Sequence, residues 1–454
     1  MVFTDNFSAP ELVSLKNSLK QRGVKYAAAS FVDVLGRTKA KTVPINHFEQ
    51  MMRGSELFIG AALTGMPQTL RDHELAAVPD PNSATILPWN HSVAWFSSDL
   101  YLRGAAFEGC SRSVLKRSLA DAAALGYRLN LGIEAEFYLL KPGNEGAWQP
   151  VSDRDTLPTP YYDFPTLLDN FAWLDELVEA MNDLGWDVYS FDHEDGNGQF
   201  EIDFNYCDAL KMGDRYTFFR LMAQEYAKRH GYIASFMPKP FAQQAGNGAH
   251  FNLSLTGEAG ENLFVTADDP RQNGLSKLGY QFIAGILQHA PALCAILAPT
   301  VNSYKRLSAK NSQSRSTWAP THVSYGTNRT NLIRIPPGGA RIECRLPDSA
   351  CNPYLATAMV LAAGLEGIRA NLDPGEAHGE NMYEYALLEL QQKGIAPLPR
   401  TLGDAIDALA TDPLGYEVLG APLFDAYLTL KSEEWETYCQ HISTWETDQY
   451  LRFF

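Results

Sequence analysis

The sequence predicts an α+β protein with two domains. Its 454 residues exceed the length that one hydrophobic core usually supports. Helix-like and strand-like runs follow one another along the chain, and the length and order of these runs change at about Gly109. A small mixed unit precedes this point and a larger one follows it. We therefore expect domains at residues 1–108 and 109–454.

The first unit is expected to contain a helix followed by short strands. The helix fits residues 10–23, and a turn at Gly36 separates the first two strands. Residues 66–90 are rich in Pro, Asp and Asn and are expected to be mostly loops. The expected strands are 26–34, 41–43, 84–87 and 92–96.

The second unit should begin with a helix that Ser113 caps and Gly126 ends. Longer helices are expected at 164–184, 212–230 and 275–298. The most apolar run, 278–299, contains two Gln residues, His289 and Pro291. These interruptions favour a buried core helix over a membrane span.

Four strand-like runs in the second unit carry polar groups on a single face. In 129–140, apolar residues alternate with Glu134 and Glu136, and alternate side chains of a strand point to opposite faces. Adjacent like charges on one face repel, so this face calls for a cation. The polar residues of the other three runs are Glu201 and Asp203; His250, Asn252 and Ser254; and Arg341, Glu343 and Arg345.

Carboxylates and arginines together indicate a site for a nucleotide. A solvated face explains any single Glu, but five of them beside His250 favour Mg²⁺ or Mn²⁺, which prefer oxygen ligands. Residues 301–340 contain six Lys or Arg and no acid, which suits phosphate or carboxylate oxygens; a surface basic patch is the alternative. Metal beside arginine implies phosphoryl transfer. A P-loop motif is absent from the sequence. The five carboxylates are Glu134, Glu136, Glu194, Glu201 and Glu343.

Composition narrows the class of protein. The net charge of −16 argues against a general nucleic-acid binder or a protein that binds anionic membranes. Six cysteines without a CxxC pair indicate reduced thiols, and the first residues lack the pattern of a signal peptide. We therefore expect a cytoplasmic protein.

Six segments of the chain match a known family in order and spacing. Together they resemble the glutamine synthetase family of glutamate–amine ligases, from about Tyr26 to the C-terminus. The resemblance is specific in the second domain and weak in the first. The segments are GIEAEFYLL, HEDGNGQFEID, GNGAHFNLSL, PTVNSYKRL, NRTNLIRIP and RIECRLPDSACNPYLA.

The resemblance implies a β-grasp N-terminal domain and a catalytic domain built on a curved antiparallel sheet flanked by helices. It also implies a ring-shaped homo-oligomer, usually a dodecamer of two stacked hexamers, whose active sites are shared between neighbouring subunits. In the family's reaction, ATP phosphorylates the γ-carboxylate of L-glutamate, and an amine then displaces phosphate. Two to three Mg²⁺ or Mn²⁺ ions per active site are implied.

The resemblance also implies roles for individual residues. One metal would be held by Glu136, Glu194 and Glu201, and the metal at the ATP phosphates by Glu134, His250 and Glu343. Glutamate would contact Gly246, Arg306 and Arg345, and the transferred phosphate and ATP would contact Arg329 and Arg334. Arg306, Arg329 and Arg345 would be the catalytic arginines. The nucleotide pocket would include Tyr206, Asn252 and Ser254, although the family usually has His at the position of Asn252.

Two departures from the family bear on the amine. The family's ammonium-binding Asp in an F-D-G-S segment is replaced by Ile59, and the flap at 308–320 contains no acid. A small hydrated ammonium ion needs carboxylates to compensate for lost water, whereas an alkylammonium favours apolar or aromatic walls. Ile59, Tyr304 and Trp318 are candidates for such a wall.

This pattern resembles the glutamate–methylamine ligase branch of the family, close to the type III glutamine synthetases. The alternatives are ammonia as the acceptor, a longer amine such as a polyamine or ethanolamine, and a catalytically silent binding protein. The intact set of Glu, His and Arg residues argues against the silent protein. Neither nucleic acid nor a membrane is expected as a partner.

Overall fold

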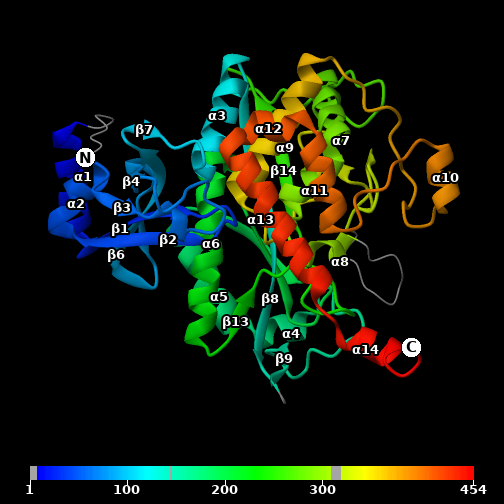
Figure 1. The fold of residues 1–454 in the computed structure, drawn as a ribbon, viewed down its shortest axis with the longest axis horizontal. Helices are drawn as coiled ribbons and strands as arrows, with labels where there is room; N and C mark the ends of the chain where they lie inside the picture. The colour runs from blue at the N-terminus through cyan, green and yellow to red at the C-terminus, as the bar shows by residue number, and fades with distance from the viewer. Residues whose placement is uncertain (1–7, 144–145, 308–318) are drawn as a thin grey trace.

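The structure is a computed structural model, and it describes residues 8–143, 146–307 and 319–454. Two β-sheets organise the chain, as the sequence predicts (Figure 1). The N-terminal sheet lies at one end of the molecule, and the second sheet lies under a layer of helices that includes α7, α9, α11 and α13. The fold class is therefore α+β, with a curved sheet flanked by helices.

The first sheet has the order β2-β1-β6-β4-β3, with β5 and β7 paired to β6. Strand β1 is parallel to β6 and antiparallel to β2, which is the mixed pairing expected of a β-grasp unit. Helices α1 (Ala9–Gln21) and α2 (Phe48–Met52) accompany it. The strands are β1 Tyr26–Val32, β2 Thr38–Pro44, β3 Glu56–Phe58, β4 Leu75–Pro79, β5 Thr85–Leu87, β6 Asn90–Leu102 and β7 Ala105–Ala106.

The second sheet has the order β10-β11-β8-β14-β17-β16-β15, and β9, β12 and β13 also pair with β8. Its pairs are antiparallel except for β15 with β16. The strands are β8 Arg128–Pro142, β9 Trp148–Pro150, β10 Val188–His193, β11 Gln199–Phe204, β12 Cys207–Asp208, β13 Ile233–Ser235, β14 Ala249–Thr256, β15 Tyr325–Gly326, β16 Ile333–Arg334 and β17 Ile342–Cys344.

Helices cover the apolar face of the second sheet. Glycines allow α7 and α9 to pack closely: a Cβ on Gly285 would lie 1.9 Å from the carbonyl oxygen of Ala363. The helices are α3 Ser111–Ala124, α4 Phe164–Asp169, α5 Phe171–Asp183, α6 Ala209–Arg229, α7 Lys277–Leu297, α8 Ser303–Leu307, α9 Pro353–Arg369, α10 Leu387–Gln392, α11 Leu402–Thr411, α12 Pro413–Leu419, α13 Ala421–Gln440 and α14 Thr444–Tyr450.

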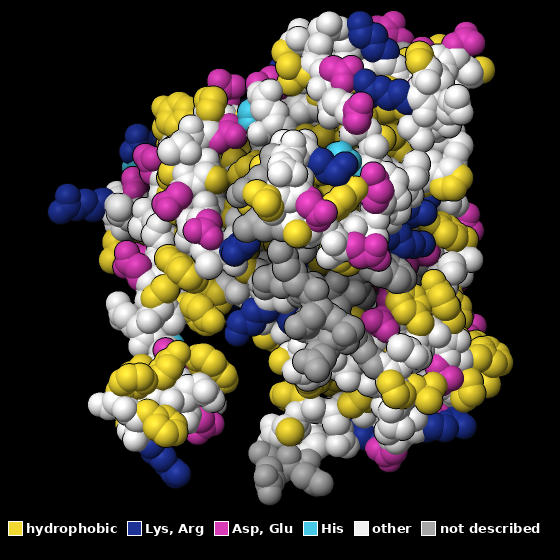
Figure 2. All heavy atoms as spheres, turned by 90° about the vertical axis from the view of Figure 1, so that its right-hand side faces the viewer, with side chains coloured by type: hydrophobic (Ala, Val, Ile, Leu, Met, Phe, Trp, Pro, Cys, Tyr) yellow, Lys and Arg dark blue, Asp and Glu magenta, His cyan; other side chains and the backbone are white. Residues whose placement is uncertain are grey.

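Helix α7 is long and apolar enough to cross a membrane, but 83% of its most apolar window is buried inside the protein. A core helix passes the same test of length and composition, and the surroundings of α7 identify it as one. On the face shown in Figure 2, Lys and Arg side chains are dispersed among Asp and Glu side chains. This face therefore carries no single basic surface.

A buried ionic cluster joins the first sheet to helices α3 and α6. Arg112 of α3 donates to Asp80 at 2.9 Å and Asp99 at 3.0 Å from the first sheet, and to Asp214 of α6 at 2.9 Å. Because removing one partner of a buried ion pair leaves an uncompensated charge, this cluster fixes the first sheet against the unit that carries the candidate site.

Three expectations about local structure are wrong. Helix α3 begins at Ser111 rather than after Ser113, because the aspartates around Arg112 hold its first turn. The helix expected at 164–184 breaks at Asn170, whose side chain donates to the Thr166 carbonyl at 2.9 Å. Leu75–Pro79, expected to be a loop, is a fully buried strand because it pairs with β3 and β6.

Candidate active site

The candidate site lies on one face of the second sheet, where β11, β8, β14 and β17 are neighbours. Side chains directly opposite each other in an antiparallel pair share a face. Glu201 lies opposite Glu136 across β11 and β8, and His250 lies opposite Glu134 across β14 and β8. Glu343 of β17 lies opposite Asn252 of β14. The period-2 alternation read from the sequence thus brings the polar groups of four strands together.

Six of these side chains form two compact groups. One contains Glu134, His250 and Glu343, and the other Glu136, Glu194 and Glu201. Within each group, one candidate ligand atom per residue lies within 4.8 Å of the others. These are the two sets that the sequence analysis proposes as metal ligands, and their role as ligands stays a prediction.

A hydrogen-bonded turn carries Glu194 to the sheet. His193 ends β10 and its Nε2 lies 2.9 Å from Asp155 Oδ2, while Asn197 donates to Asp155 Oδ1 at 2.7 Å. Tyr161 donates from its hydroxyl to Glu194 Oε1 at 3.3 Å. The single non-strand member of the two groups is therefore held from several sides.

The group of three carboxylates is poorly compensated by the protein. Burial raises the pKa of Glu194 and Glu201 well above the usual range, and neighbouring carboxylates raise both further. Burial would also raise the pKa of Glu136, but a hydrogen bond from His250 Nε2 at 3.1 Å and one from the Gly248 N–H at 2.6 Å hold it low. Buried like charges of this kind are stable when a cation lies between them.

The second group is better compensated. Burial opposes ionisation of Glu343, but Arg345, His250 and Arg334 lower its pKa to about 2. Arg334 Nη1 lies 2.7 Å from Glu343 Oε2, and Arg345 contacts the other oxygen. Burial, followed by Glu343 and Asp203, raises the pKa of Glu134 to about 7.

His250 supplies a further candidate donor atom. Burial and the nearby Arg345 lower its pKa to about 4, so the imidazole is neutral at neutral pH. Its Nδ1 is buried and has no hydrogen-bond partner among the described residues. A neutral ring whose other nitrogen donates to Glu136 keeps a lone pair at Nδ1. Oxygen-rich donor sets with one imidazole fit Mg²⁺ or Mn²⁺, so these residues fit the group that the sequence implies.

The four predicted arginines surround this face. Arg306 is buried, with Nη1 and Nη2 each 3.0 Å from the carbonyl oxygens of Leu346 and Arg345. Arg329 is close enough to Asp192 and Asp203 to lower their pKa values electrostatically, although burial raises both to about 6. The charges of this face therefore alternate between acidic groups and guanidinium groups.

The glycines of the 246–248 turn are required by close approaches. A Cβ on Gly246 would lie 2.7 Å from the Pro238 carbonyl oxygen and 2.8 Å from Cγ of Arg306. The Gly246 carbonyl accepts from Gln199 Nε2 at 3.0 Å. This turn therefore brings backbone, rather than side chains, to the edge of the Glu136 group.

A cavity of about 430 Å³ opens beside Glu134. Its walls include the three residues predicted to contact the nucleotide, Tyr206, Asn252 and Ser254. Asn252 donates to Glu134 Oε1 at 2.8 Å and accepts from Arg341 Nε at 2.7 Å, so it connects the cavity to the second group. Tyr206 is 65% exposed, which leaves its ring free to stack on a ligand.

Comparison with known proteins agrees with the family that the sequence resembles. Residues 108–450 match the model described as "Glutamine synthetase, catalytic domain". This chain belongs to the glutamine synthetase family.

Similar members of the family include two curated proteins. A glutamate–methylamine ligase of Methyloversatilis universalis is 44% identical, and the alignment covers 96% of this chain and 98% of that protein. A glutamine synthetase of Rhizobium meliloti is 41% identical with the same two coverages. Among solved structures, a "GmaS/ADP complex" superposes with a TM-score of 0.90 at 40% identity, covering 96% of this chain and 99% of that one.

The three residues proposed for an amine wall do not meet in the described part of this chain. Ile59 follows β3 of the first sheet and is 55% exposed. Tyr304 is 4% exposed and donates to the Cys294 carbonyl at 3.3 Å, so it is a core residue and does not support the role proposed for it. Trp318 lies outside the described residues, as does most of the 308–320 segment.

Two residues beside the candidate site were given no role in the sequence analysis. Asp203 lines the cavity beside Glu134, and burial together with Asp192 raises its pKa to about 6. It shares a strand face with Glu201, so the alternation contained the signal. Tyr161 contacts Glu194, but it lies in a loop, where no strand alternation indicates which side chains it meets.

Proposed function

We propose that the chain is an ATP-dependent ligase that joins methylamine to the γ-carboxylate of L-glutamate. An oxygen of the γ-carboxylate attacks the γ-phosphorus of ATP, and ADP leaves, giving γ-glutamyl phosphate. The methylamine nitrogen then attacks the acyl carbon, loses a proton, and displaces phosphate. The products are γ-glutamylmethylamide, ADP and phosphate.

One observation carries the ligase assignment: two compact groups of candidate ligands, five Glu and one His, lie on one sheet face beside a cavity of about 430 Å³, and Arg334 and Arg345 contact one of them. Carboxylates that burial holds at raised pKa are suited to divalent cations rather than to solvent. The 44% identity to a glutamate–methylamine ligase supports the choice of acceptor. We propose two to three Mg²⁺ or Mn²⁺ ions per site, which when bound would neutralise phosphate charge.

The chain's own groups would divide the remaining work. Tyr206, Asn252 and Ser254 would hold the nucleotide in the 430 Å³ cavity. Arg329 and Arg334 would place guanidinium N–H groups against the transferred phosphoryl oxygens, where negative charge is largest. Arg306, Arg345 and the Gly246 backbone would orient glutamate so that its γ-carboxylate faces ATP.

The choice of methylamine rests on the chemistry around the acceptor. An alkylammonium has a methyl group that favours apolar or aromatic contacts, and it has one fewer N–H to compensate than ammonium. Ile59, which follows β3, is exposed and so is accessible to a neighbouring copy. Tyr161, beside Glu194 and in contact with the Tyr162 ring at 4.7 Å between centroids, adds an aromatic surface from this chain.

We further propose that residues 1–108 and 109–454 are separate domains of a ring-shaped homo-oligomer, a dodecamer of two stacked hexamers. An exposed Ile59 that does not reach its own site supports shared sites. Light scattering on the purified protein tests this. A monomer of about 50 kDa that turns over at full rate would contradict it.

A second candidate is glutamine synthesis with ammonia. The 41% identity to a Rhizobium meliloti glutamine synthetase favours it almost as strongly as the methylamine relative favours the first. A ligase for a longer amine is a third possibility that no specific residue supports.

Phosphate release tests all three candidates. The protein is incubated with glutamate, ATP and Mg²⁺, and each of ammonia, methylamine, ethylamine and putrescine is titrated. We expect the highest kcat/KM with methylamine, while Glu343→Gln provides the background. A higher kcat/KM with ammonia would favour glutamine synthesis, and no release with any amine would contradict a ligase.

A further inference from the structure

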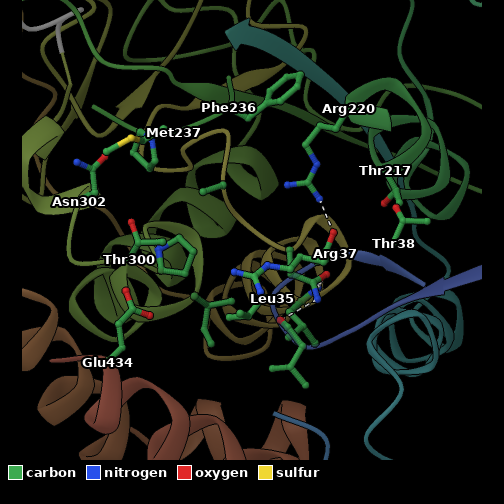
Figure 3. Close-up of a pocket in the computed structure, with 18 of the residues that line it drawn as sticks. Leu35, Arg37, Thr38, Thr217, Arg220, Phe236, Met237, Thr300, Asn302 and Glu434 are labelled. Atoms are coloured by element: carbon green, nitrogen blue, oxygen red, sulfur yellow. Dashed lines mark hydrogen bonds between the residues drawn. The ribbon is translucent and has the colours of Figure 1, made fainter. Parts of the chain in front are cut away.

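A second and larger cavity lies away from the candidate active site. Its volume is about 670 Å³, and none of the six candidate metal ligands lines it. It is enclosed by the β1–β2 turn, α6, the segment after α7, and α13. Figure 3 shows Arg37 and Arg220 on one side of it and Thr300, Asn302 and Glu434 on the other. The proposed ligase reaction assigns no role to this space.

The charge of the cavity is cationic in a chain of net charge −16. Arg37, Arg220 and Lys431 line it together with a single carboxylate, Glu434. That carboxylate is already engaged: Lys431 Nζ donates to Oε2 at 2.9 Å, and the Val301 N–H donates to Oε1 at 3.1 Å. Neither Arg37 nor Arg220 forms an ion pair with a carboxylate that lines the cavity.

The donors of two of these cations are incompletely used. Lys431 is fully buried, yet its ammonium has one hydrogen bond to the described residues, although it carries three N–H donors. The Arg37 guanidinium has no hydrogen bond or ion pair with any residue that the structure describes. Arg220, by contrast, donates to the backbone carbonyls of Gly36, Ser349 and Cys351. Of these two cations only Lys431 is buried, and a buried donor without an acceptor is costly, so its unused N–H groups and the exposed Arg37 guanidinium are available to an anionic ligand.

Apolar side chains form much of the remaining wall. They come from the β1–β2 turn, from α6 and from the segment before the 239–247 loop. The apolar lining includes Leu35, Leu221, Phe236, Met237, Ile296 and Leu355. A ligand that fits both features has a carboxylate head for the cations and an apolar body for the wall.

One wall residue connects the cavity to the proposed glutamate site. Asn302 Oδ1 accepts from the Lys239 N–H at 2.7 Å, and its Nδ2 donates to the Lys239 carbonyl at 3.0 Å. Lys239 begins the segment that ends at Gly246. The Pro238 carbonyl accepts from the Asn247 N–H at 2.8 Å, which closes that segment into a loop.

We propose that this cavity is a second ligand site for a small carboxylate with an apolar body, held by Arg37 and Lys431. Through Asn302, an occupant would restrain the loop that carries Gly246 and so alter the binding of glutamate. The binding claim is independent of the proposed ligase activity because it is measured without turnover.

Calorimetry with hexanoate tests the binding claim, with hexanamide as the neutral matched probe. Because charge-assisted hydrogen bonds are lost, we expect hexanamide to bind at least about tenfold more weakly. Saturating ADP and glutamate should leave hexanoate binding in place. Equal binding of the two probes, or displacement of hexanoate by ADP and glutamate, would overturn the proposal.

Variants locate the site. We expect Arg37→Gln and Lys431→Met each to weaken hexanoate binding at least about tenfold. Arg22→Gln, which removes an exposed arginine at the end of α1, should leave binding unchanged. Arg37 is exposed and makes no side-chain contact that folding requires, so its variant should melt like the parent. Unaltered hexanoate binding in a folded Arg37→Gln protein would overturn the assignment.

The effect of the second site on glutamate binding is measured by comparing the KM for glutamate with and without saturating hexanoate. We expect a change of at least about twofold, within the usual range of coupling energies. The change should disappear in Arg37→Gln at the same hexanoate concentration. A glutamate KM that hexanoate leaves unchanged while bound would contradict the coupling.

Discussion

The two groups of candidate ligands share one sheet face but differ in how the protein balances their charge. Glu343 contacts two arginines, and its pKa falls to about 2. Glu201 has no hydrogen bond or ion pair to any described residue, and burial and the neighbouring carboxylates raise its pKa. The Glu343 group is therefore partly compensated by protein cations, whereas Glu201 has no such compensation within the described chain. The difference means that removing a carboxylate should affect stability in opposite directions at the two groups.

The largest expected effect is on turnover. Glu201→Gln and Glu343→Gln should each lower the rate of phosphate release at least about 100-fold, because each removes an ionised ligand from a site that stabilises phosphate charge. Steady-state assays at saturating ATP and Mg²⁺ measure this. Near-normal turnover in either variant would contradict the assignment of that group.

Stability should separate the same two variants. Glu343→Gln leaves Arg334 and Arg345 without their buried partner, so we expect a loss of about 3 kcal/mol in the free energy of unfolding. Glu201→Gln removes an uncompensated carboxylate, so its melting temperature in EDTA should equal or exceed that of the parent. Denaturation in EDTA measures the stability of both variants. Equal destabilisation would contradict the proposed difference in charge compensation between the two groups.

Metal should stabilise the protein more at high pH than at low pH. The folded-state pKa of Glu134 is about 7, above the ordinary value of 4.5. Without metal, folding therefore holds a proton that the unfolded chain releases, and stability falls as pH rises from about 4.5 to about 7. A bound cation favours the ionised form and opposes this loss.

Melting curves with Mn²⁺ and with EDTA measure that effect at two pH values. We expect the stabilisation by Mn²⁺ to be larger by at least about 2 °C at pH 8 than at pH 5.5. Glu134→Gln, which removes the titrating carboxyl group, should reduce the difference. Stabilisation that is independent of pH would show that these carboxylates are not held protonated in the metal-free protein.

The smallest expected effect lies in the nucleotide cavity. Tyr206→Ala should raise the KM for ATP about tenfold, the loss expected when a base loses an aromatic surface. Tyr206→Phe keeps the ring and serves as the control. An unchanged KM for ATP in the alanine variant would place the base elsewhere.

The sequence predicted the strand-borne part of the site because alternation alone sets which side chains share a face. Glu201, Glu134 and His250 lie where that period places them. Tyr161 was not predicted, because its contact with Glu194 depends on a loop whose course no local pattern encodes. Tyr304 shows a related limit: residue type alone suggests an amine wall, but α8 places its side chain in the core, so that role stays a prediction.

Two strands show the same difference between what local pattern predicts and what it does not. The run that contains Glu201 and Asp203 was predicted to be a strand from its alternation, and it forms the strand Gln199–Phe204. The strand Leu75–Pro79 was missed because it depends on pairing with β3 and β6 rather than on its own composition. Local periodicity decides the first kind of element, and long-range pairing decides the second.

Competition between amines tests the central claim most directly. The protein is supplied with glutamate, ATP, Mg²⁺ and equal concentrations of methylamine and ammonia, with the unprotonated fraction of each calculated at the assay pH. Mass spectrometry then measures γ-glutamylmethylamide against glutamine. We predict that γ-glutamylmethylamide is the main product, and a majority of glutamine would contradict the account.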